Sequence, residues 1–177
     1  GHTAVDGNGF PTAFGTMDDL TYSYMGNQLK AVDDNIASSA TQGFVDGAEL
    51  ATEYNYDQNG NMTSDLNKGI PVDGITYNYL NLPTNIVVNS VPSGTISYIY
   101  DAMGTKLEKT AGTTTTQYAG NYVYENGTLQ FFNQPEGYVT PNGQGGYDYV
   151  YQYRDHLGNV RLSYTDSDGN GHIIDSG

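Results

Sequence analysis

Hydrophobic and polar residues alternate along several short stretches of this chain, and a turn-like sequence follows each alternation. The clearest case spans residues 149–164, whose entering arm carries tyrosine at every second position and whose leaving arm places Val160, Leu162 and Tyr164 on one face. A period of two is typical of a β-strand, because successive side chains of a strand point to opposite faces. The intervening residues 155–159 include the glycine and asparagine that tight turns use for positive φ. This stretch therefore predicts a β-hairpin.

Weaker copies of this hairpin precede it. Each copy opens with a Tyr-x-Tyr pair, and these pairs begin at Tyr22, Tyr54, Tyr77, Tyr98 and Tyr122. The pairs recur at intervals of roughly two dozen residues, a spacing typical of repeat architectures in which no single unit can bury its own face. The sequence thus predicts an all-β chain of repeated antiparallel β-hairpins that form a twisted, curved sheet.

The turns of these copies differ in sequence. Asn59-Gly60 in the second copy and Asn126-Gly127 in the fifth are the pairs that favour two-residue hairpin turns. In the third copy Pro83 stands where the others have glycine, and it predicts a turn of another type.

Two segments interrupt the repeats. Residues 33–48 predict an irregular insertion with a helical turn, since 29–40 is the best, though weak, helix candidate. The Gly-, Pro- and Asn-rich residues 133–146 predict a surface loop. The whole chain is therefore divided into an irregular N-terminal segment 1–19, hairpin repeats over 20–148 and a last region over 149–177.

Composition agrees with the all-β prediction. The chain has 17 Tyr, 5 Phe, no Trp and 23 Gly, and tyrosine favours strands whereas glycine favours turns. A tyrosine face suits a half-wetted sheet, such as a wide sheet around a lumen, because each ring packs across strands while its hydroxyl seeks a hydrogen bond. Structural packing is the simpler interpretation of this face, and sugar binding by ring stacking is the functional alternative.

The charge and the residues that are missing exclude several classes of function. A net charge of −14, from 20 acidic and 6 basic residues, repels phosphates and anionic lipid, which argues against nucleic acid and membrane partners. The absence of cysteine excludes disulfides, thiolate nucleophiles and zinc–thiolate sites. No stretch has the length and hydrophobicity of a membrane span or the pattern of a signal peptide. Both ends look cut, so we expect an excised piece of a longer protein.

Few residues suggest chemistry. Asp166, Asp168 and Asn170 match the start of a calcium-binding loop, but Gly177 stands where such a loop needs a bidentate carboxylate, and a hairpin turn explains the same residues. His156 beside Asp155, with Ser163 nearby, completes no catalytic triad. We therefore predict no enzymatic activity and no cofactor.

The unit Tyr-x-Tyr-Asp-x-x-Gly-Asn resembles the YD repeat of the RHS family, over roughly residues 20–177. The run 153–161 resembles the signature that opens the RHS repeat-associated core, and 75–86 is similar to RHS proteins of Bacteroidetes-type bacteria. Within that run, Arg154 and Arg161 are expected to pair with Asp155 or with carboxylates of the adjacent hairpin. The residues that carry the resemblance are Tyr54, Tyr56, Asp57, Gly60, Asn61, Tyr98, Tyr100, Asp101, Gly104, Arg154, Asp155, His156, Gly158, Asn159 and Arg161.

The resemblance implies a spiral β-sheet that forms part of a hollow shell. Such shells enclose a variable C-terminal effector, often a toxin, and the family core cleaves itself near an Asp-Pro-x-Gly-Leu motif that this chain lacks. The expected role is a structural segment of a secreted or cell-surface bacterial shell whose partner is the rest of its own polypeptide. The alternative is a surface carbohydrate-binding or adhesion module that presents its tyrosine faces and residues 133–146 to a glycan. Open edge strands also predict self-association.

Overall fold

The protein is built from antiparallel β-strands. A computed structural model describes residues 2–5, 11–36 and 43–166. Within these ranges every strand pairs antiparallel, and the only helical element is one turn of 3-10 helix, η1, over Leu66–Lys68. The predicted all-β class with repeated antiparallel hairpins is therefore confirmed. None of the described helical residues forms a segment long or apolar enough to cross a membrane.

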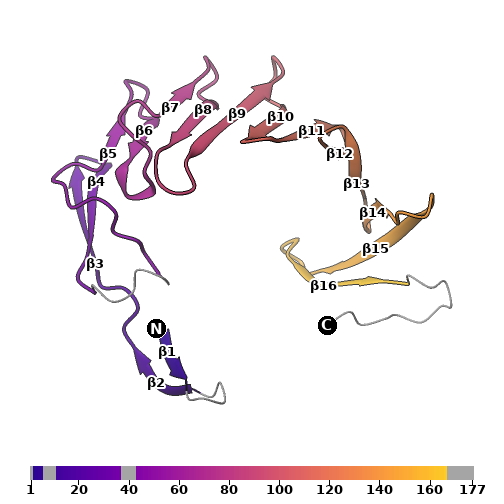
Figure 1. The fold of residues 1–177 in the computed structure, drawn as a ribbon, viewed down its shortest axis with the longest axis horizontal. Helices are drawn as coiled ribbons and strands as arrows, with labels where there is room; N and C mark the ends of the chain where they lie inside the picture. The colour runs from indigo at the N-terminus through magenta and orange to yellow at the C-terminus, as the bar shows by residue number, and fades with distance from the viewer. Residues whose placement is uncertain (1, 6–10, 37–42, 167–177) are drawn as a thin grey trace. The chain divides into compact units, whose positions relative to one another are not determined.

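The chain divides into two compact units, over 1–97 and 98–177. In the first unit, hairpins follow one another along the chain (Figure 1), and the first three are separate two-stranded sheets. The strands of this unit are β1 (His2–Val5), β2 (Pro11–Gly15), β3 (Leu20–Met25), β4 (Gln28–Asp34), β5 (Tyr54–Tyr56), β6 (Met62–Asp65), β7 (Ile75–Tyr77), β8 (Pro83–Val88) and most of β9 (Gly94–Tyr100).

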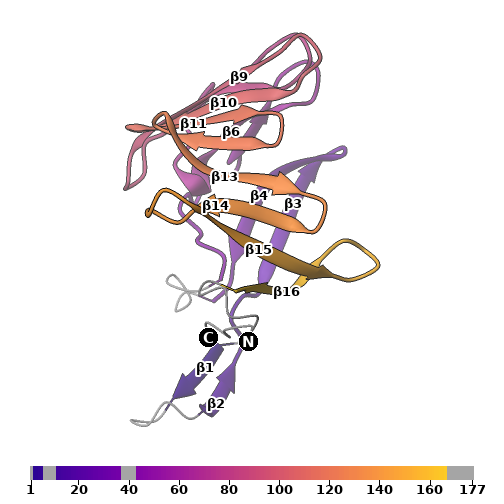
Figure 2. The same cartoon turned by 90° about the vertical axis from the view of Figure 1, so that its right-hand side faces the viewer.

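In the second unit each strand pairs with the next one in the sequence, as Figure 2 shows for β13 to β16. The strands are β10 (Lys106–Ala111), β11 (Thr114–Ala119), β12 (Tyr122–Glu125), β13 (Thr128–Gln134), β14 (Gly137–Pro141), β15 (Tyr147–Arg154) and β16 (Val160–Thr165). The largest sheet has ten strands in the order β16 to β7. This order is a meander, because no strand is skipped.

Five of the hairpins contain a β-bulge at the same place. The register shifts between Ser23 and Tyr24, between Asn55 and Tyr56, and between Thr76 and Tyr77, each time just before the loop. β12–β13 and β15–β16 shift at the corresponding position. A bulge bends its strand and increases the local twist, so the repeat includes a regular bend that the spacing of the tyrosines does not reveal.

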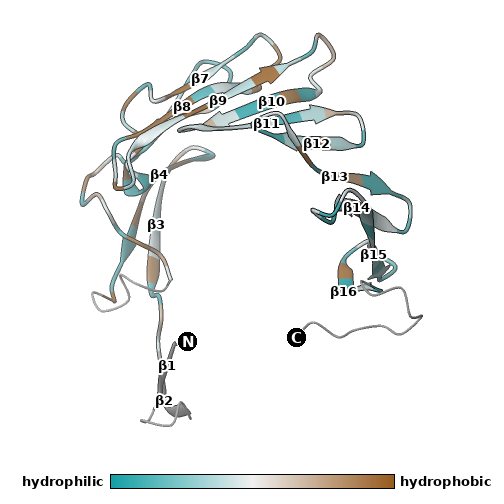
Figure 3. Cartoon of the chain, turned by 45° about the vertical axis from the view of Figure 1, so that its right-hand side comes forward, coloured by the Kyte–Doolittle hydropathy of each residue, from teal (hydrophilic) through white to brown (hydrophobic). Residues whose placement is uncertain are grey.

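The buried core is small. Among the described side chains, the buried hydrophobic ones are Ala31, Val32, Tyr54, Ile70 and Val139. Most strand residues are half-buried, and hydrophobic positions occur in short stretches between polar ones (Figure 3). This agrees with the half-wetted tyrosine sheet expected from composition.

Two sequence predictions about the first unit are wrong. Residues 1–19 are not irregular throughout, since β1 and β2 form an antiparallel pair in which His2 lies opposite Gly15. In both strands apolar residues are adjacent instead of alternating with polar ones, so the period of two that marks a strand is missing. The helix candidate 29–40 is instead largely strand β4 as far as the structure describes it. Ala31 and Val32 are both buried there, at 4% and 2% exposure, so tertiary packing overrides helix propensity.

The predicted surface loop 133–146 is also wrong in part. It contains strand β14, in which Val139 is only 1% exposed. Gly137 permits this strand, because a Cβ at that position would collide with the carbonyl oxygen of Val150 on β15. The turn residues gather only in the loop 142–146 that follows.

Candidate functional site

The signature residue Asp57 organises the loop that closes the β5–β6 hairpin. Its backbone N–H donates to the Asn61 carbonyl at 2.9 Å. Its Oδ1 accepts the N–H groups of Asn59 and Asn61 at 2.9 and 2.8 Å, and its Oδ2 accepts the Asn61 side-chain amide at 2.8 Å. Gly60 donates to the Asp57 carbonyl at 3.1 Å and has φ +86°, where glycine is favoured. Asp57 therefore closes the loop, and the side-chain amides of Asn59 and Asn61 also donate to Asn81 Oδ1 in the next hairpin, at 3.0 and 2.9 Å.

Asp101 and Asp155 do the same in two further hairpins. Asp101 Oδ1 accepts the N–H groups of Met103 and Thr105 at 2.9 and 2.8 Å. Asp155 Oδ1 accepts those of Leu157 and Asn159, both at 2.9 Å. The signature aspartates thus close five-residue loops, and Asn61 and Asn159 contribute side-chain amides rather than positive φ.

Two loops of this kind escaped the sequence motif. Asn78 Oδ1 accepts the N–H groups of Leu80 and Leu82 at 2.9 and 3.0 Å, and Asn81 takes the glycine position with φ +59°. The prediction of a different turn in the third copy is therefore wrong, because Pro83 begins β8 after a loop of the same kind. Asn142 likewise accepts two backbone N–H groups in the loop 142–146. A motif that allowed Asn for Asp and Asn for Gly would have found the 78–82 loop.

The two predicted two-residue turns have different outcomes. Asn126 and Gly127 connect β12 and β13 directly, with φ of +48° and +80°, as predicted. Asn59-Gly60 does not form such a turn, since it lies inside the 57–61 loop. The Oδ1 of Asp57 outcompetes the shorter turn by binding two backbone N–H groups.

The arginines of the last loop have separate partners. Arg161 meets Asp155 Oδ2 with Nη2 at 2.6 Å and Nε at 2.8 Å, so its predicted pairing is confirmed. Arg154 instead donates to the Gln152 side chain at 2.7 Å, and no described carboxylate pairs with it. His156 is an exposed residue of the loop.

The loop geometry lowers the pKa of all three signature aspartates. For Asp57 and Asp155 the largest cause is the hydrogen bond from the side-chain amide of Asn61 or Asn159, and for Asp101 it is the backbone N–H of Thr105. Each donor stabilises the charged form of the carboxyl group. These carboxylates are held ionised as acceptors, which is unsuited to general acid catalysis near neutral pH.

Tyrosine rings pack mainly against neighbouring strands. Tyr151 and Tyr164 stack across β15 and β16 with centroids 5.5 Å apart, and Tyr122 lies 5.1 Å from Phe132 across β12 and β13. Lys106 lies over the Tyr98 ring at 5.0 Å. Aromatic pairs of this geometry stabilise a sheet by about 0.5–1.5 kcal/mol each.

A fully buried carboxylate links β4, β5 and η1. Glu53 is 0% exposed, and its Oε2 accepts the Val32 N–H at 3.0 Å and the Asn67 amide at 2.8 Å. Its Oε1 accepts the Leu50 N–H at 3.4 Å. No sequence motif marked this residue, because its partners are distant in the sequence.

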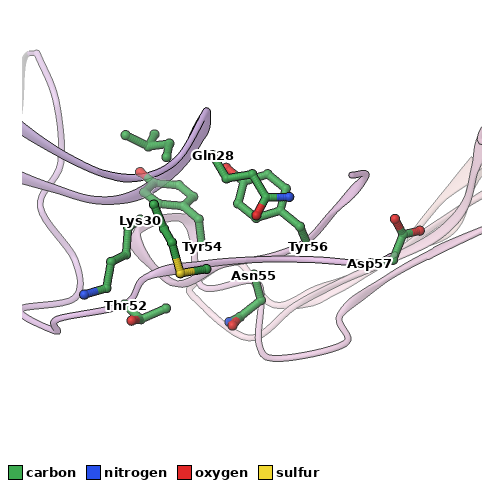
Figure 4. Close-up of a pocket in the computed structure, with 9 residues that line it drawn as sticks. Gln28, Lys30, Thr52, Tyr54, Asn55, Tyr56 and Asp57 are labelled. Atoms are coloured by element: carbon green, nitrogen blue, oxygen red, sulfur yellow. The ribbon is translucent and has the colours of Figure 1, made fainter. Parts of the chain in front are cut away.

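A cleft of about 230 Å³ lies between the β3–β4 and β5–β6 hairpins (Figure 4). Burial raises the pKa of Tyr54 and Tyr56, whose hydroxyls are hydrogen-bonded to Asn67 and to the Leu29 backbone. The side chains of Gln28 and Lys30 make no hydrogen bond within the described residues. The lining residues are Met25, Gln28, Leu29, Lys30, Thr52, Tyr54, Asn55, Tyr56 and Asp57.

Three carboxylates elsewhere in the first unit lie close enough together to hold a cation. Oxygens of Asp33, Asp46 and Glu49 lie within 4.8 Å of one another. Asp46 Oδ2 accepts the Asp34 N–H at 3.1 Å, whereas its buried Oδ1 has no described hydrogen-bond partner. Of the predicted calcium residues, Asp166 is exposed, while Asp168 and Asn170 lie outside the described residues.

Compared with known proteins, the chain matches no family model and no curated protein.

Proposed function

We propose that this chain is a non-enzymatic wall segment of an RHS-type shell. One observation carries the proposal: the same hairpin loop recurs, and the signature aspartate of each loop accepts backbone N–H groups of that loop. These three aspartates are held as hydrogen-bond acceptors, a role that builds a repeated hairpin and does not suit general acid catalysis. A wall is built from many similar hairpins, and these loops close successive hairpins with the same set of hydrogen bonds.

The proposed wall surrounds a C-terminal effector that belongs to the same polypeptide. The chain's role is to isolate that effector until release from a secreted or cell-surface bacterial protein. An acidic segment of charge −14 also suits a container, because repulsion between copies limits the self-association that open strand edges favour.

Protease protection of the complete encoded polypeptide tests this proposal. The proposed effector region of that polypeptide is digested once in the intact protein and once as a separate fragment. Containment predicts that the region survives in the intact protein at a protease concentration that destroys the fragment. Equal digestion rates in the two contexts would reject it.

Glycan binding is a second candidate, and the cleft between β3–β4 and β5–β6 favours it. Tyr54 and Tyr56 have fixed hydroxyls, and the Gln28 amide and Lys30 ammonium are available to a polar ligand. An aromatic wall with a few polar groups is a common design of ligand sites. The small volume of about 230 Å³ suits a single sugar residue.

Saturation-transfer NMR with galactose and N-acetylglucosamine tests this candidate. Gln28→Ala and Lys30→Ala should weaken the signal while leaving the fold intact, because neither side chain holds the structure together. Gln58→Ala is the matched control, since Gln58 is exposed and does not line the cleft. Absence of a signal from the unsubstituted protein, or equal signals from all variants, would reject the cleft as a sugar site.

A further inference from the structure

Asparagine followed by glycine is a chemically reactive pair. The backbone nitrogen of the glycine can attack the asparagine side-chain carbonyl carbon, because no Cβ obstructs its approach. The described chain contains such pairs at Asn59-Gly60, Asn126-Gly127 and Asn142-Gly143. Their surroundings differ in ways that set their reactivity.

Asn142 is held in a polarising environment. Its Oδ1 accepts two backbone N–H groups, from Gln144 and Gly146, both at 3.0 Å. Negative charge develops on this oxygen when the neighbouring carbon is attacked, and fixed N–H donors aimed at such an oxygen stabilise the transition state. The attacking nitrogen is available, since the N–H of Gly143 makes no hydrogen bond within the described residues. Both residues are exposed to water.

Asn59 is in the opposite situation. The N–H of Gly60 already donates to the Asp57 carbonyl at 3.1 Å, so the nucleophile is engaged. The Asn59 amide nitrogen donates to Asn81 Oδ1 at 3.0 Å, which restrains the side chain. Among the described residues, no backbone N–H donates to Asn59 Oδ1 to polarise its carbonyl.

Asn126 is expected to be intermediate in reactivity between Asn59 and Asn142. Its Oδ1 accepts a single backbone N–H, from Thr115 at 2.9 Å. The N–H of Gly127 makes no hydrogen bond within the described part of the chain. One polarising donor instead of two predicts a rate between those of Asn59 and Asn142.

We propose that Asn142 is a site of spontaneous deamidation in the folded protein. The Gly143 nitrogen loses its proton to solvent base and forms a bond to Cγ of Asn142. The bond from Cγ to Nδ2 breaks, ammonia leaves with a proton from water, and a succinimide remains. Water then opens the ring and leaves a carboxylate, as aspartate or isoaspartate, so no oxidant or reductant is required.

The aspartate product fits the fold. Asp57, Asp101 and Asp155 occupy the same first position in their loops and accept backbone N–H groups with the same geometry. Deamidation of Asn142 therefore produces the loop chemistry found elsewhere in the repeat, with charge-assisted hydrogen bonds in place of neutral ones. The isoaspartate product lengthens the backbone and is expected to disrupt the loop between β14 and β15.

Peptide mapping by mass spectrometry tests the proposal. The purified protein is incubated at mildly alkaline pH in buffer and, separately, in denaturant, and conversion is followed at all three sites. In the folded protein, Asn142 should convert roughly tenfold faster than Asn59, with Asn126 between them. In denaturant the three rates should converge, because each pair then has the same local sequence chemistry.

Two results would each overturn one part of the proposal, the first the deamidation in the folded protein and the second the fit of its aspartate product. One is that Asn142 converts more slowly when folded than when denatured, since the loop would then protect it. The other concerns Asn142→Asp, which should keep the melting temperature at or above that of the unsubstituted protein. A clear loss of stability in that variant would show that the aspartate product does not fit the loop.

Discussion

Removal of the buried Glu53 carboxylate should weaken the first unit strongly. Glu53→Ala abolishes the hydrogen bonds to Val32, Asn67 and Leu50. The Val32 N–H is then left inside, next to a side chain only 2% exposed. Leaving a buried donor unsatisfied costs about 1–3 kcal/mol, and hydrogen bonds to charged groups contribute about 1.5–3 kcal/mol each.

We expect a loss of about 3–5 kcal/mol in the free energy of unfolding. This is less than the sum of the three hydrogen bonds, because water that enters the vacated space replaces some of them. That loss is a large fraction of the 5–15 kcal/mol typical of a folded domain. Glu53→Gln should cost about 1–3 kcal/mol, since its amide nitrogen must face an N–H donor. Glu49→Ala is the control in the same segment and should cause no loss of stability, because Glu49 is exposed and its removal relieves repulsion from Asp33 and Asp46.

Urea unfolding followed by tyrosine fluorescence measures these changes, since the chain has 17 Tyr and no Trp. Hydrogen exchange at the Val32 amide locates the effect, and this amide should lose most of its protection in Glu53→Ala. A loss below about 1 kcal/mol, comparable to that of the Glu49 control, would refute the reasoning that this carboxylate holds β4 to β5.

Three further changes probe the loops. The pKa values of Asp57, Asp101 and Asp155 are lowered in the folded protein, so their contribution to stability is complete above the unfolded-state pKa of about 4 and is lost as pH falls through the lower folded pKa values. Replacing all three by Asn, the residue that already occupies this loop position at Asn78 and Asn142, should reduce the loss of stability at acidic pH measured by urea unfolding. An unchanged loss of stability would exclude these three groups as its cause. Gly158→Ala should cost about 1–2 kcal/mol at φ +85°, with Gly158→Asn less costly because asparagine tolerates this conformation; thermal unfolding that ranks the two variants in the reverse order would contradict the strain argument. Gly137→Ala should be more damaging than Gly158→Ala, because its Cβ would collide with the Val150 carbonyl, and equal melting temperatures for the two variants would show that the β14–β15 pairing can adjust.

The local part of the fold could be predicted from the sequence. The loops of Asp57, Asp101 and Asp155 each depend on hydrogen bonds within five consecutive residues, so a short motif is enough to mark them. The same motif missed Asn78 because asparagine replaces aspartate while keeping the acceptor oxygen that binds the backbone N–H groups.

The long-range part could not be predicted. Glu53 binds Val32 and Asn67, which are 21 and 14 residues away in the sequence, and no local pattern specifies such a pairing. β4 and β14 were missed for a related reason, because the burial of Ala31, Val32 and Val139 depends on strands elsewhere in the fold. The cleft could not be predicted either, because it lies between the β3–β4 and β5–β6 hairpins, and the sequence does not show that these two hairpins form separate sheets.

The most direct test of containment is an electron cryomicroscopy structure of the complete encoded polypeptide. The account predicts that the hairpins of this chain form part of a continuous wall, with density for the C-terminal region of the same polypeptide inside it. A well-resolved structure in which this sheet encloses no polypeptide, and the C-terminal region lies outside in solvent, would contradict the proposed function.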